Sequence, residues 1–476
     1  VFNPNGRFRV VSTKPMPGTS WIDALVAADC RLEICTASKT ILSVDDILQL
    51  IGDRCDGVIG QLTEEWGERL FAALARAGGR AYSNMAVGFN NVDVDAATRH
   101  SISVGNTPGV LTETTAELAA ALTVAAARRV VEADYFMRAG KYDGWLPTMF
   151  IGNLLKGQTV GIIGAGRIGS AYARMMVEGF KMNLIYYDLY QSKRLEESVS
   201  AYSCFLQSQG EPPVTWRRAS SPEEVLQVAD VVSLHPVLDK TTFHLLDERR
   251  LNMMKKDAIL VNCSRGPVVD EVALVRHLKA NPAFRAALDV FEDEPLMKPG
   301  LSTLPNVVVV PHIASASQWT RAGMAALAAL NVAGYPVWHN PNDVLPFLDP
   351  THPPPKACPS IVNAKQLGAV SGVWCMLCGG WCVDEWCKLC RSSVNVEQLC
   401  ACMWCMWCMG CDFVFPFVNR DPSKFRFPVW LFPPTTRLSC SPIFFPHPLP
   451  PFPLFHSSPL PQCVSPGLPT TTPSKL

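Results

Sequence analysis

The sequence predicts an α/β protein in which parallel sheets are covered by helices, followed by a low-complexity tail. Short apolar runs alternate with helical stretches from residue 1 to about residue 357, and this alternation is typical of parallel sheets with helices on both faces. A glycine-rich loop lies in mid-chain between one apolar run and the next helical stretch. After about residue 357 the composition changes to Cys, Trp, Met, Phe and Pro, without a sustained helix or strand period.

The first part of the chain predicts one sheet and the helix that leaves it. Gly57–Gly60 and Ile102–Gly105 are short apolar runs that predict buried strands, and Trp66–Ala77 has the spacing of an amphipathic helix. Leu111–Arg138 is rich in alanine and contains little to break a helix, so we expect one long helix there. Such a helix would carry the chain from one domain to the next.

The middle of the chain predicts a second sheet. Thr159–Ile163 predicts a buried strand that leads into the glycine loop, and Ser170–Phe180 predicts the helix after it. Asn183–Asp188 is the next expected strand and ends on an acidic residue. Trp319–Ala333 predicts the last helix. The remaining strands are expected at Val231–Leu234, Ala258–Val261, Ala286–Val290 and Val307–Val310.

Composition argues against several classes of function. The 42 basic residues balance 42 acidic ones, so the charge does not indicate binding to nucleic acid or to an anionic membrane. No stretch reaches the roughly 18 apolar residues that a membrane helix requires, and no basic and apolar start predicts secretion. Six of the 18 cysteines precede residue 360, which fits a reduced intracellular enzyme, and we expect no metal site. The chain begins at Val1 without a Met, so we expect the true start to be missing or trimmed.

The glycine loop predicts a dinucleotide-binding site, because it follows a strand, opens a helix and precedes an acid after the next strand. Gly164 permits a tight turn, Gly166 lets the backbone approach a pyrophosphate, and Gly169 allows the helix to pack closely on the strand. The pyrophosphate would meet free N–H groups and a favourable dipole at the helix N-terminus. Asp188 would bind the ribose hydroxyls and repel a 2′-phosphate, so we expect NADH to be preferred over NADPH; the alternative is an ordinary turn acid. The residues expected to contact the cofactor here are Gly164, Gly166, Arg167, Ile168, Gly169 and Asp188.

Three downstream residues, Arg265, Glu294 and His312, supply the groups needed to reduce a 2-keto acid. Histidine suits the proton step because it changes charge near neutral pH, and Glu294 beside it would favour the imidazolium form, which donates a proton. Arg265 stays charged and can hydrogen-bond a carboxylate and a carbonyl oxygen together. Taken alone, a His after Pro or an Arg before Gly-Pro is more often structural. The combination behind a dinucleotide loop favours catalysis.

These segments resemble the D-2-hydroxyacid dehydrogenase family, and within it the branch of plant peroxisomal hydroxypyruvate reductases, over about residues 2–368. The resemblance implies two Rossmann-like domains with parallel sheets. Residues 1–125 and 313–345 would form a discontinuous substrate-binding domain, and residues 126–312 the NAD-binding domain. It also implies a homodimer formed through the cofactor domain. The helix after Asn331 is a few residues shorter than is usual in the family.

The resemblance assigns further residues to the site. The family's acid is the second in its Asp-Val-x-Glu-x-Glu pattern, which favours Glu294 over Glu292. Backbone N–H groups of Val87 and Gly88 would bind the substrate carboxylate together with Arg265, and this requires close approach to Gly88. The other residues expected to line the cofactor are His235, Pro236, Cys263, Ser264 and Asp289.

The activity that the resemblance implies is NADH-dependent reduction of hydroxypyruvate to D-glycerate, and of glyoxylate to glycolate, in photorespiration. Another small D-2-hydroxyacid is the nearest alternative, because loop geometry decides the ranking of substrates. Formate dehydrogenases match less well, since that branch carries Gln at the position of Glu294. A non-catalytic, NAD-binding corepressor-like scaffold is the alternative of a different class, and the complete set of three residues argues against it.

The tail, residues 346–476, interrupts a pattern typical of the family. Relatives end with a segment like Ala357–Lys365, a short Leu-Gly-Leu-Pro-type stretch and Ser-Lys-Leu; here a foreign segment separates the two ends of that pattern. Val370 and Ser371 can be encoded by GTG-AGT, a 5′ splice site, and Phe, Pro, Leu and Ser are what a pyrimidine-rich tract encodes. We therefore expect about residues 369–463 to be a retained intron or a gene-model error, in a tail without stable structure.

Two other features of the tail carry an interpretation. Four Cys-x-x-Cys pairs, with the spacing of zinc ribbons, make a zinc-binding appendage the competing hypothesis. The final Ser474, Lys475 and Leu476 match the signal read by the peroxisomal import receptor, so we expect peroxisomal localisation.

Overall fold

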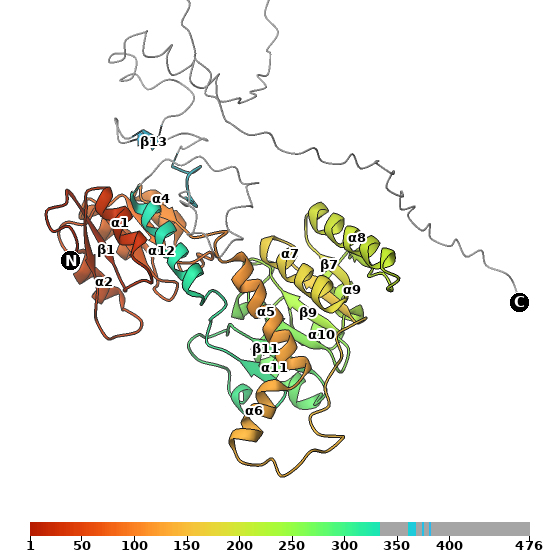
Figure 1. The fold of residues 1–476 in the computed structure, drawn as a ribbon. Coiled ribbons are helices and arrows are strands. Elements are labelled where there is room, and N and C mark those ends of the chain that lie inside the picture. Colours follow the sequence, from red (N-terminus) through yellow and green to blue (C-terminus); the bar gives the residue numbers. More distant parts are fainter. Residues whose placement is uncertain (334–359, 368–373, 376–379, 382–476) are drawn as a thin grey trace, which may run out of the picture. The chain divides into compact units, whose positions relative to one another are not determined.

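The computed structural model describes residues 1–333, 360–367, 374–375 and 380–381. They include two parallel sheets with helices on both faces (Figure 1), which confirms the predicted α/β class. Strands β13 (Trp374–Cys375) and β14 (Gly380–Trp381) form a short antiparallel pair. Apart from these strands, the features predicted for residues 369–476 lie outside the described residues. Over the described residues, no helix is both long and apolar enough to cross a membrane.

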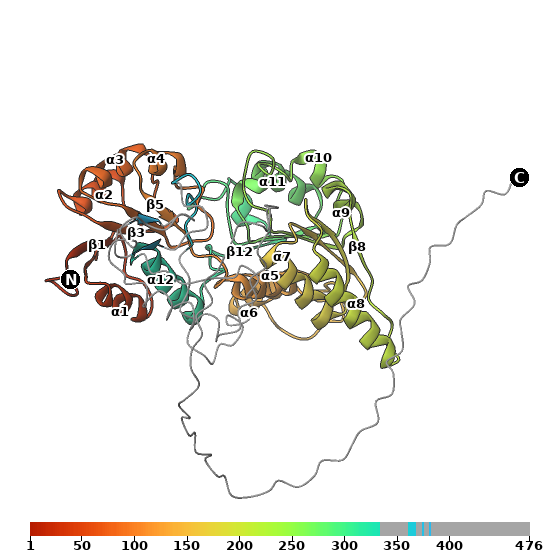
Figure 2. The ribbon, with the colours of Figure 1, turned by 90° about the horizontal axis from the view of Figure 1, so that it is seen from above.

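The first sheet has five strands in the order β2-β1-β3-β4-β5. Helices α1 and α12 cover one face, and α2, α3 and α4 cover the other (Figure 2). The last helix therefore packs on the sheet that the chain forms first. The elements are β1 (Phe8–Ser12), α1 (Ser20–Ala27), β2 (Cys30–Ile34), α2 (Val44–Ile51), β3 (Gly57–Gly60), α3 (Glu68–Arg76), β4 (Ala81–Asn84), α4 (Val94–Arg99), β5 (Ser103–Gly105) and α12 (Gln318–Ala333).

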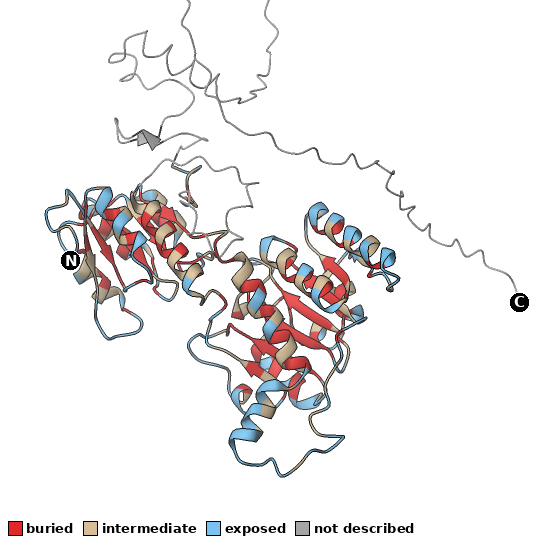
Figure 3. Ribbon diagram, in the orientation of Figure 1, coloured by how far each residue is buried: buried red, intermediate tan, exposed pale blue. Residues whose placement is uncertain are grey.

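The second sheet has seven strands in the order β12-β11-β10-β9-β6-β7-β8. Figure 3 shows that its strands are buried while the helices around them keep an exposed side. Helices α5, α7 and α8 pack on one face, and α9, α10 and α11 on the other. The strands are β6 (Thr159–Ile163), β7 (Asn183–Tyr187), β8 (Trp216–Arg218), β9 (Val231–Leu234), β10 (Ile259–Asn262), β11 (Arg285–Leu288) and β12 (Val307–Val309). The helices are α5 (Thr112–Ala127), α6 (Val130–Arg138), α7 (Arg167–Arg174) with the π-turn η1 (Met175–Gly179), α8 (Lys193–Ser208), α9 (Pro222–Val228), α10 (Glu248–Leu251), η2 (Gly266–Val268), α11 (Glu271–Ala280) and η3 (Leu301–Thr303).

The prediction of one continuous helix over Leu111–Arg138 is wrong, because α5 ends at Ala127 and α6 begins at Val130. Arg129 between them has a left-handed backbone, with φ of 56°. Its guanidinium binds both carboxylate oxygens of Glu132, in the first turn of α6, at 2.8 and 2.6 Å. Helix propensity alone does not reveal this break, since propensity is a weak prior that tertiary contacts override.

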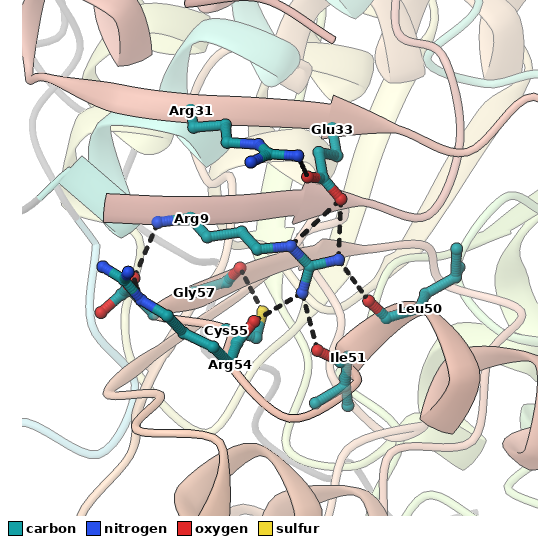
Figure 4. Close-up of polar contacts among 9 residues, drawn as sticks. Arg9, Arg31, Glu33, Leu50, Ile51, Arg54, Cys55 and Gly57 are labelled. Carbon is teal, nitrogen blue, oxygen red and sulfur yellow. Dashed lines mark hydrogen bonds and ion pairs between the residues drawn. The ribbon is translucent and has the colours of Figure 1, made fainter. Parts of the chain in front are cut away.

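Arg9 in β1 joins the end of helix α2 to the first sheet (Figure 4). Its guanidinium donates to the carbonyl oxygens of Leu50 (2.9 Å) and Ile51 (2.7 Å), the last residues of α2, and to that of Arg54 (2.6 Å). It also binds the Glu33 carboxylate at 2.7 Å, and this hydrogen bond raises the pKa of Arg9. A cation at a helix C-terminus is favoured by the helix dipole as well as by the free carbonyls.

Replacing Arg9 with Ala is expected to lower the free energy of unfolding by about 2 kcal/mol, because several acceptors lose a charged donor at once. Urea unfolding curves would measure the loss. Arg54→Ala is the matched control, because that side chain is 70% exposed and its removal should change stability by less than about 0.5 kcal/mol. Equal losses in the two variants would contradict the role assigned to Arg9.

Candidate active site

Most of the predicted site residues lie at the carboxyl edge of the second sheet. The strand order reverses between β6 and β9, since the chain continues from β6 to β7 and β8 on one side and from β9 to β10 and β11 on the other. In open α/β sheets, ligands bind at the carboxyl edge beside such a switch point. The residues that follow these strands are Gly164 after β6, Asp188 after β7, His235 after β9, Cys263 after β10 and Asp289 after β11.

Two of the three glycines of the loop have a steric reason, and the third leaves open space. Gly164 has φ of 95°, and a Cβ there would lie 2.7 Å from the backbone carbon of His235. A Cβ on Gly169 would lie 2.0 Å from the carbonyl oxygen of Gly164, so helix α7 packs directly on the loop. Gly166 has open space where its Cβ would be. Helix α7 begins at Arg167, earlier than predicted, so its N-terminus lies at the loop itself.

These features fit the pyrophosphate of a dinucleotide, which needs free backbone N–H groups and room beside the loop. Asp188 lies next to the loop because the Gly164 N–H donates to the Tyr187 carbonyl (2.9 Å). One oxygen of its carboxylate accepts the Tyr190 N–H (3.0 Å), and the remaining lone pairs are available to a ribose. Ile168, inside the motif, is partly buried and packs against the hydrophobic core.

The loops after β9 and β10 are neighbours, because these two strands pair. The Nε2 of His235 lies 2.8 Å from Ser233 Oγ, and burial lowers the pKa of His235 to about 3, so the ring is neutral. The backbone nitrogen of Pro236 would lie 2.8 Å from a Cβ on Gly164, so this loop packs on the glycine loop. Burial raises the pKa of the Cys263 thiol well above its usual range, so it is no nucleophile at neutral pH.

Asn262, which the sequence analysis missed, shapes the turn that carries Arg265. Its side chain is 1% exposed and lies at the end of β10. Its Oδ1 accepts hydrogen bonds from the Ser264 N–H (3.0 Å) and hydroxyl (2.7 Å), while its Nδ2 donates to the Arg265 carbonyl (2.9 Å). An Asx-type turn of this kind is the signal that could have identified it.

Arg265 reaches the loop that follows β4 in the first sheet. Its Nε donates to Asn90 Oδ1 (3.0 Å), and its Nη1 donates to the Ser264 carbonyl (2.7 Å). A Cβ on Gly88 would lie only 1.8 Å from Arg265 Nη2, so the guanidinium occupies the space that a side chain would take. Burial lowers the pKa of Arg265 while the charge of Glu294 raises it, and the guanidinium remains a cation.

His312 and Glu294 form a hydrogen-bonded pair, with Nδ1 and Oε2 2.9 Å apart. The second carboxylate oxygen accepts the Phe291 N–H (3.0 Å). Burial raises the pKa of Glu294, but the hydrogen bond and charge of His312, together with the Phe291 N–H and the charge of Arg265, outweigh it, and the net shift is downward. An ionised carboxylate only accepts hydrogen bonds, so Nδ1 carries the proton and Nε2 is left to exchange one.

Glu292 does not take part in this pair. Its Oε1 lies 3.1 Å from the Nε2 of His244, and its Oε2 accepts the Glu271 N–H (3.2 Å). The structure therefore places Glu294, and not Glu292, beside His312.

Asp289 is fully buried and holds the loop that carries His312. Its two carboxylate oxygens accept the N–H groups of Ile313 (2.6 Å) and Ala314 (2.9 Å), and its carbonyl accepts the His312 N–H (2.9 Å). The sequence analysis assigned this acid to the cofactor. In the structure its hydrogen bonds fix the backbone on both sides of the imidazole.

The backbone of Val87 and Gly88 is fixed by two buried amides that the sequence analysis did not single out. Asn106 Nδ2 donates to the Val87 carbonyl (2.9 Å), and Asn84 Nδ2 donates to the Gly88 carbonyl (3.0 Å). The structure assigns no hydrogen bond to the N–H of either residue within its described parts. Both N–H groups therefore remain available to an anion near Arg265.

Comparisons with known proteins agree with this arrangement. Residues 120–314 match the NAD binding domain of D-isomer specific 2-hydroxyacid dehydrogenases. The chain is 74% identical over 372 residues to a glycerate dehydrogenase of Cucumis sativus, covering 77% of this chain and 97% of that protein. It is 72% identical to the peroxisomal glycerate dehydrogenase of Arabidopsis thaliana, covering 77% of this chain and 96% of the relative.

A crystal structure of a Thermus thermophilus protein has the same fold, with a TM-score of 0.60 and 35% identity, covering 69% of this chain and 96% of that one. Similarity at this level over nearly the whole length of the plant relatives, together with the matched NAD-binding domain, identifies the family. The chain belongs to the NAD-dependent D-2-hydroxyacid dehydrogenases.

Proposed function

We propose that this enzyme reduces hydroxypyruvate to D-glycerate, and glyoxylate to glycolate, with NADH in photorespiration. The observation that carries the proposal is the hydrogen bond between His312 and Glu294, which leaves Nε2 of the imidazole as a proton donor. The relatives named glycerate dehydrogenase and a glyoxylate reductase of Thermococcus litoralis, 46% identical over 255 residues, support these two substrates.

In this proposal Arg265 and the N–H groups of Val87 and Gly88 bind the substrate carboxylate, and Arg265 also polarises the C2 carbonyl. NADH, when bound, supplies the hydride. His312 Nε2 gives its proton to the C2 oxygen, and Glu294 orients the ring by accepting a hydrogen bond from Nδ1. In the oxidative direction the neutral imidazole accepts the proton instead.

The cofactor would be held by residues of the second sheet. Gly164, Gly166, Arg167, Ile168 and Gly169 would hold the pyrophosphate at the start of α7, and Asp188 would hold the adenosine ribose. The neutral His235, with Pro236, Cys263, Ser264 and Asp289, would line the remainder of the site.

Loss of NADH absorbance with hydroxypyruvate, glyoxylate and pyruvate as substrates tests this function. The first two should turn over and the product should be the D-isomer. Preference for a different keto acid would indicate that the enzyme belongs to another branch of its family. NADH binding without turnover of any keto acid would contradict the proposal and favour a non-catalytic, NAD-binding scaffold.

Replacing Asp188 with Ala is expected to lower the preference for NADH over NADPH by at least about tenfold, because the carboxylate that repels a 2′-phosphate is removed. The ratio of kcat/KM for the two cofactors measures it. Asp95→Ala, at an exposed acid of α4, should leave the ratio unchanged. An unaltered ratio in Asp188→Ala would count against the assignment.

We also propose a homodimer formed through the second sheet's domain. Helix α6 and the loop after it expose several large apolar side chains, including Tyr135 (71%), Met137 (56%), Trp145 (77%) and Leu154 (74%). Large apolar side chains exposed along one segment support an interaction site there. Light scattering after size-exclusion chromatography should give twice the mass of one chain, and a single-chain mass would contradict the dimer.

Three further proposals concern the organisation of the chain. Residues 1–125 and 313–345 form the substrate-binding domain, and residues 126–312 the NAD-binding domain.

The enzyme is directed to the peroxisome by its last three residues, Ser474, Lys475 and Leu476. Deleting these three residues from a fluorescently tagged chain tests this localisation. About residues 369–463 derive from a retained intron or a gene-model error; RNA reads that run continuously through this segment in most transcripts would exclude the gene-model error.

A further inference from the structure

A short segment beyond the last helix binds the edge of the first sheet. Ile361 forms an antiparallel bridge with Gly105, and the Val362 N–H donates to the Val104 carbonyl (2.8 Å). The fully buried Asn363 accepts the Val104 N–H (2.9 Å) and donates to the Ile102 carbonyl (2.9 Å). Residues 360–363 therefore cover the free edge of β5, which would otherwise expose unpaired backbone groups.

Ser360, at the start of this segment, is connected to the loop of Val87 and Gly88 through the side chain of Asn106. Its hydroxyl donates to Asn106 Oδ1 (2.7 Å), and its carbonyl accepts the Asn106 N–H (3.1 Å). Asn106 Nδ2 donates to the Val87 carbonyl (2.9 Å). The Val87 carbonyl can only accept a hydrogen bond, so the NH2 end of the Asn106 amide must face it. The amide oxygen, Oδ1, then needs a hydrogen-bond donor. Ser360 supplies that donor.

Asn331 in α12 fixes the same arrangement from a second side. Its Oδ1 accepts the Ser360 N–H (2.7 Å), and its Nδ2 donates to the Asn106 carbonyl (2.8 Å). The side chain is 4% exposed, and a Cβ on Gly105 would lie 2.6 Å from it. The two buried asparagines and the half-buried Ser360 are thus joined in one hydrogen-bonded network, and such a network holds its members more firmly away from water than in it.

We propose that Ser360 is a positioning residue for keto-acid binding, acting through Asn106 on the Val87–Gly88 peptide. In a trans peptide the carbonyl oxygen and the following N–H point in opposite directions. Holding the Val87 carbonyl against Asn106 therefore turns the Gly88 N–H away from it, towards the side where the substrate carboxylate is proposed to bind. This inference rests on the proposed function, and it gives the segment after α12 a part in substrate binding.

The test compares Ser360→Ala, Ser360→Thr and Ser103→Ala in the full chain. Ser103 lies in β5 and its hydroxyl also donates to a backbone carbonyl, that of Arg80 (3.2 Å), but it has no hydrogen bond to Asn106. Ser360→Ala should raise KM for hydroxypyruvate about fivefold, the size of one lost hydrogen bond, with kcat and NADH affinity nearly unchanged. Ser360→Thr keeps the hydroxyl and should restore the wild-type KM, and Ser103→Ala should resemble wild type.

The melting temperature of each variant distinguishes a positioning role of Ser360 from a role in folding alone. A KM of Ser360→Ala equal to that of Ser103→Ala would overturn the inference. So would a parallel loss of NADH affinity, kcat and melting temperature, because that result marks a purely structural residue. A wild-type chain that turns over no keto acid would overturn the proposed function and this inference with it, whereas normal wild-type turnover with an unaffected Ser360→Ala overturns the inference alone.

Discussion

Replacing His312 with Gln is expected to lower kcat for hydroxypyruvate reduction by about 10³-fold, within the range typical of general acid–base catalysis. The glutamine amide can still donate to Glu294, so the loop geometry should persist, but it carries no proton that can be transferred at neutral pH. NADH affinity should change little, since the proposed cofactor contacts lie on other loops. Stopped-flow or steady-state loss of NADH absorbance measures the effect.

His244→Gln is the matched control for this experiment. Both histidines bind a glutamate of the same segment, His312 at 2.9 Å from Glu294 and His244 at 3.1 Å from Glu292. Only the His312 pair lies in the proposed active site, so His244→Gln should retain most of the wild-type kcat. Similar losses in both variants would show that the pairs act by holding the segment 291–298, and the assignment of His312 as the proton donor would fail.

The dinucleotide loop could be predicted from sequence because its chemistry is local. Gly164, Gly166 and Gly169 are fixed by the turn from β6 into α7, and the structure shows a steric reason for the first and last of them. The proximity of His312 and Glu294 followed from a family resemblance, because 18 residues separate them along the chain. Spacing alone would have left them as two unrelated polar residues.

The residues that hold the site in place could not be predicted in the same way. Asn84, Asn106 and Asn262 are buried amides that donate to backbone carbonyls, and for Asn106 the acceptor, Val87, lies 19 residues away along the chain. An asparagine near a strand end is read from sequence as a turn residue. Its role as a positioning group depends on which carbonyl the fold brings to it. The edge-binding segment at 360–363 escaped prediction for the same reason.

Strand β8 and the helix break at Arg129 are two parts of the fold that the hydrophobic pattern and helix propensity of the sequence did not predict. Trp216–Arg218 is only three residues long and carries two arginines, so it lacks the apolar run that identified the other strands of its sheet. It is an edge strand, and exposed edges tolerate charge. Arg129 interrupts an alanine-rich stretch by a left-handed backbone conformation that local propensity disfavours.

Replacing Gly88 with Ala is expected to lower kcat/KM for the keto acid by about 10²-fold, the scale of a misplacement by about 1 Å, without destabilising the fold. The new Cβ would lie 1.8 Å from Arg265 Nη2, and because that atom ends a flexible side chain, the guanidinium moves rather than the backbone. Gly67→Ala, whose Cβ would contact nothing within 4 Å, is the control for replacing a glycine in the same part of the chain.

The decisive comparison repeats Gly88→Ala in an enzyme that already carries Arg265→Ala. Arg265→Ala alone should lower kcat/KM by about 10³-fold, because it removes both a carboxylate anchor and a donor to the developing oxyanion. In that background the space beside Gly88 is empty, so the added methyl group should cost less than about twofold, a strong departure from additivity. If Gly88→Ala instead costs the same factor in both backgrounds, the glycine is needed for approach of the substrate itself, and the contact with Arg265 is not what excludes a side chain there.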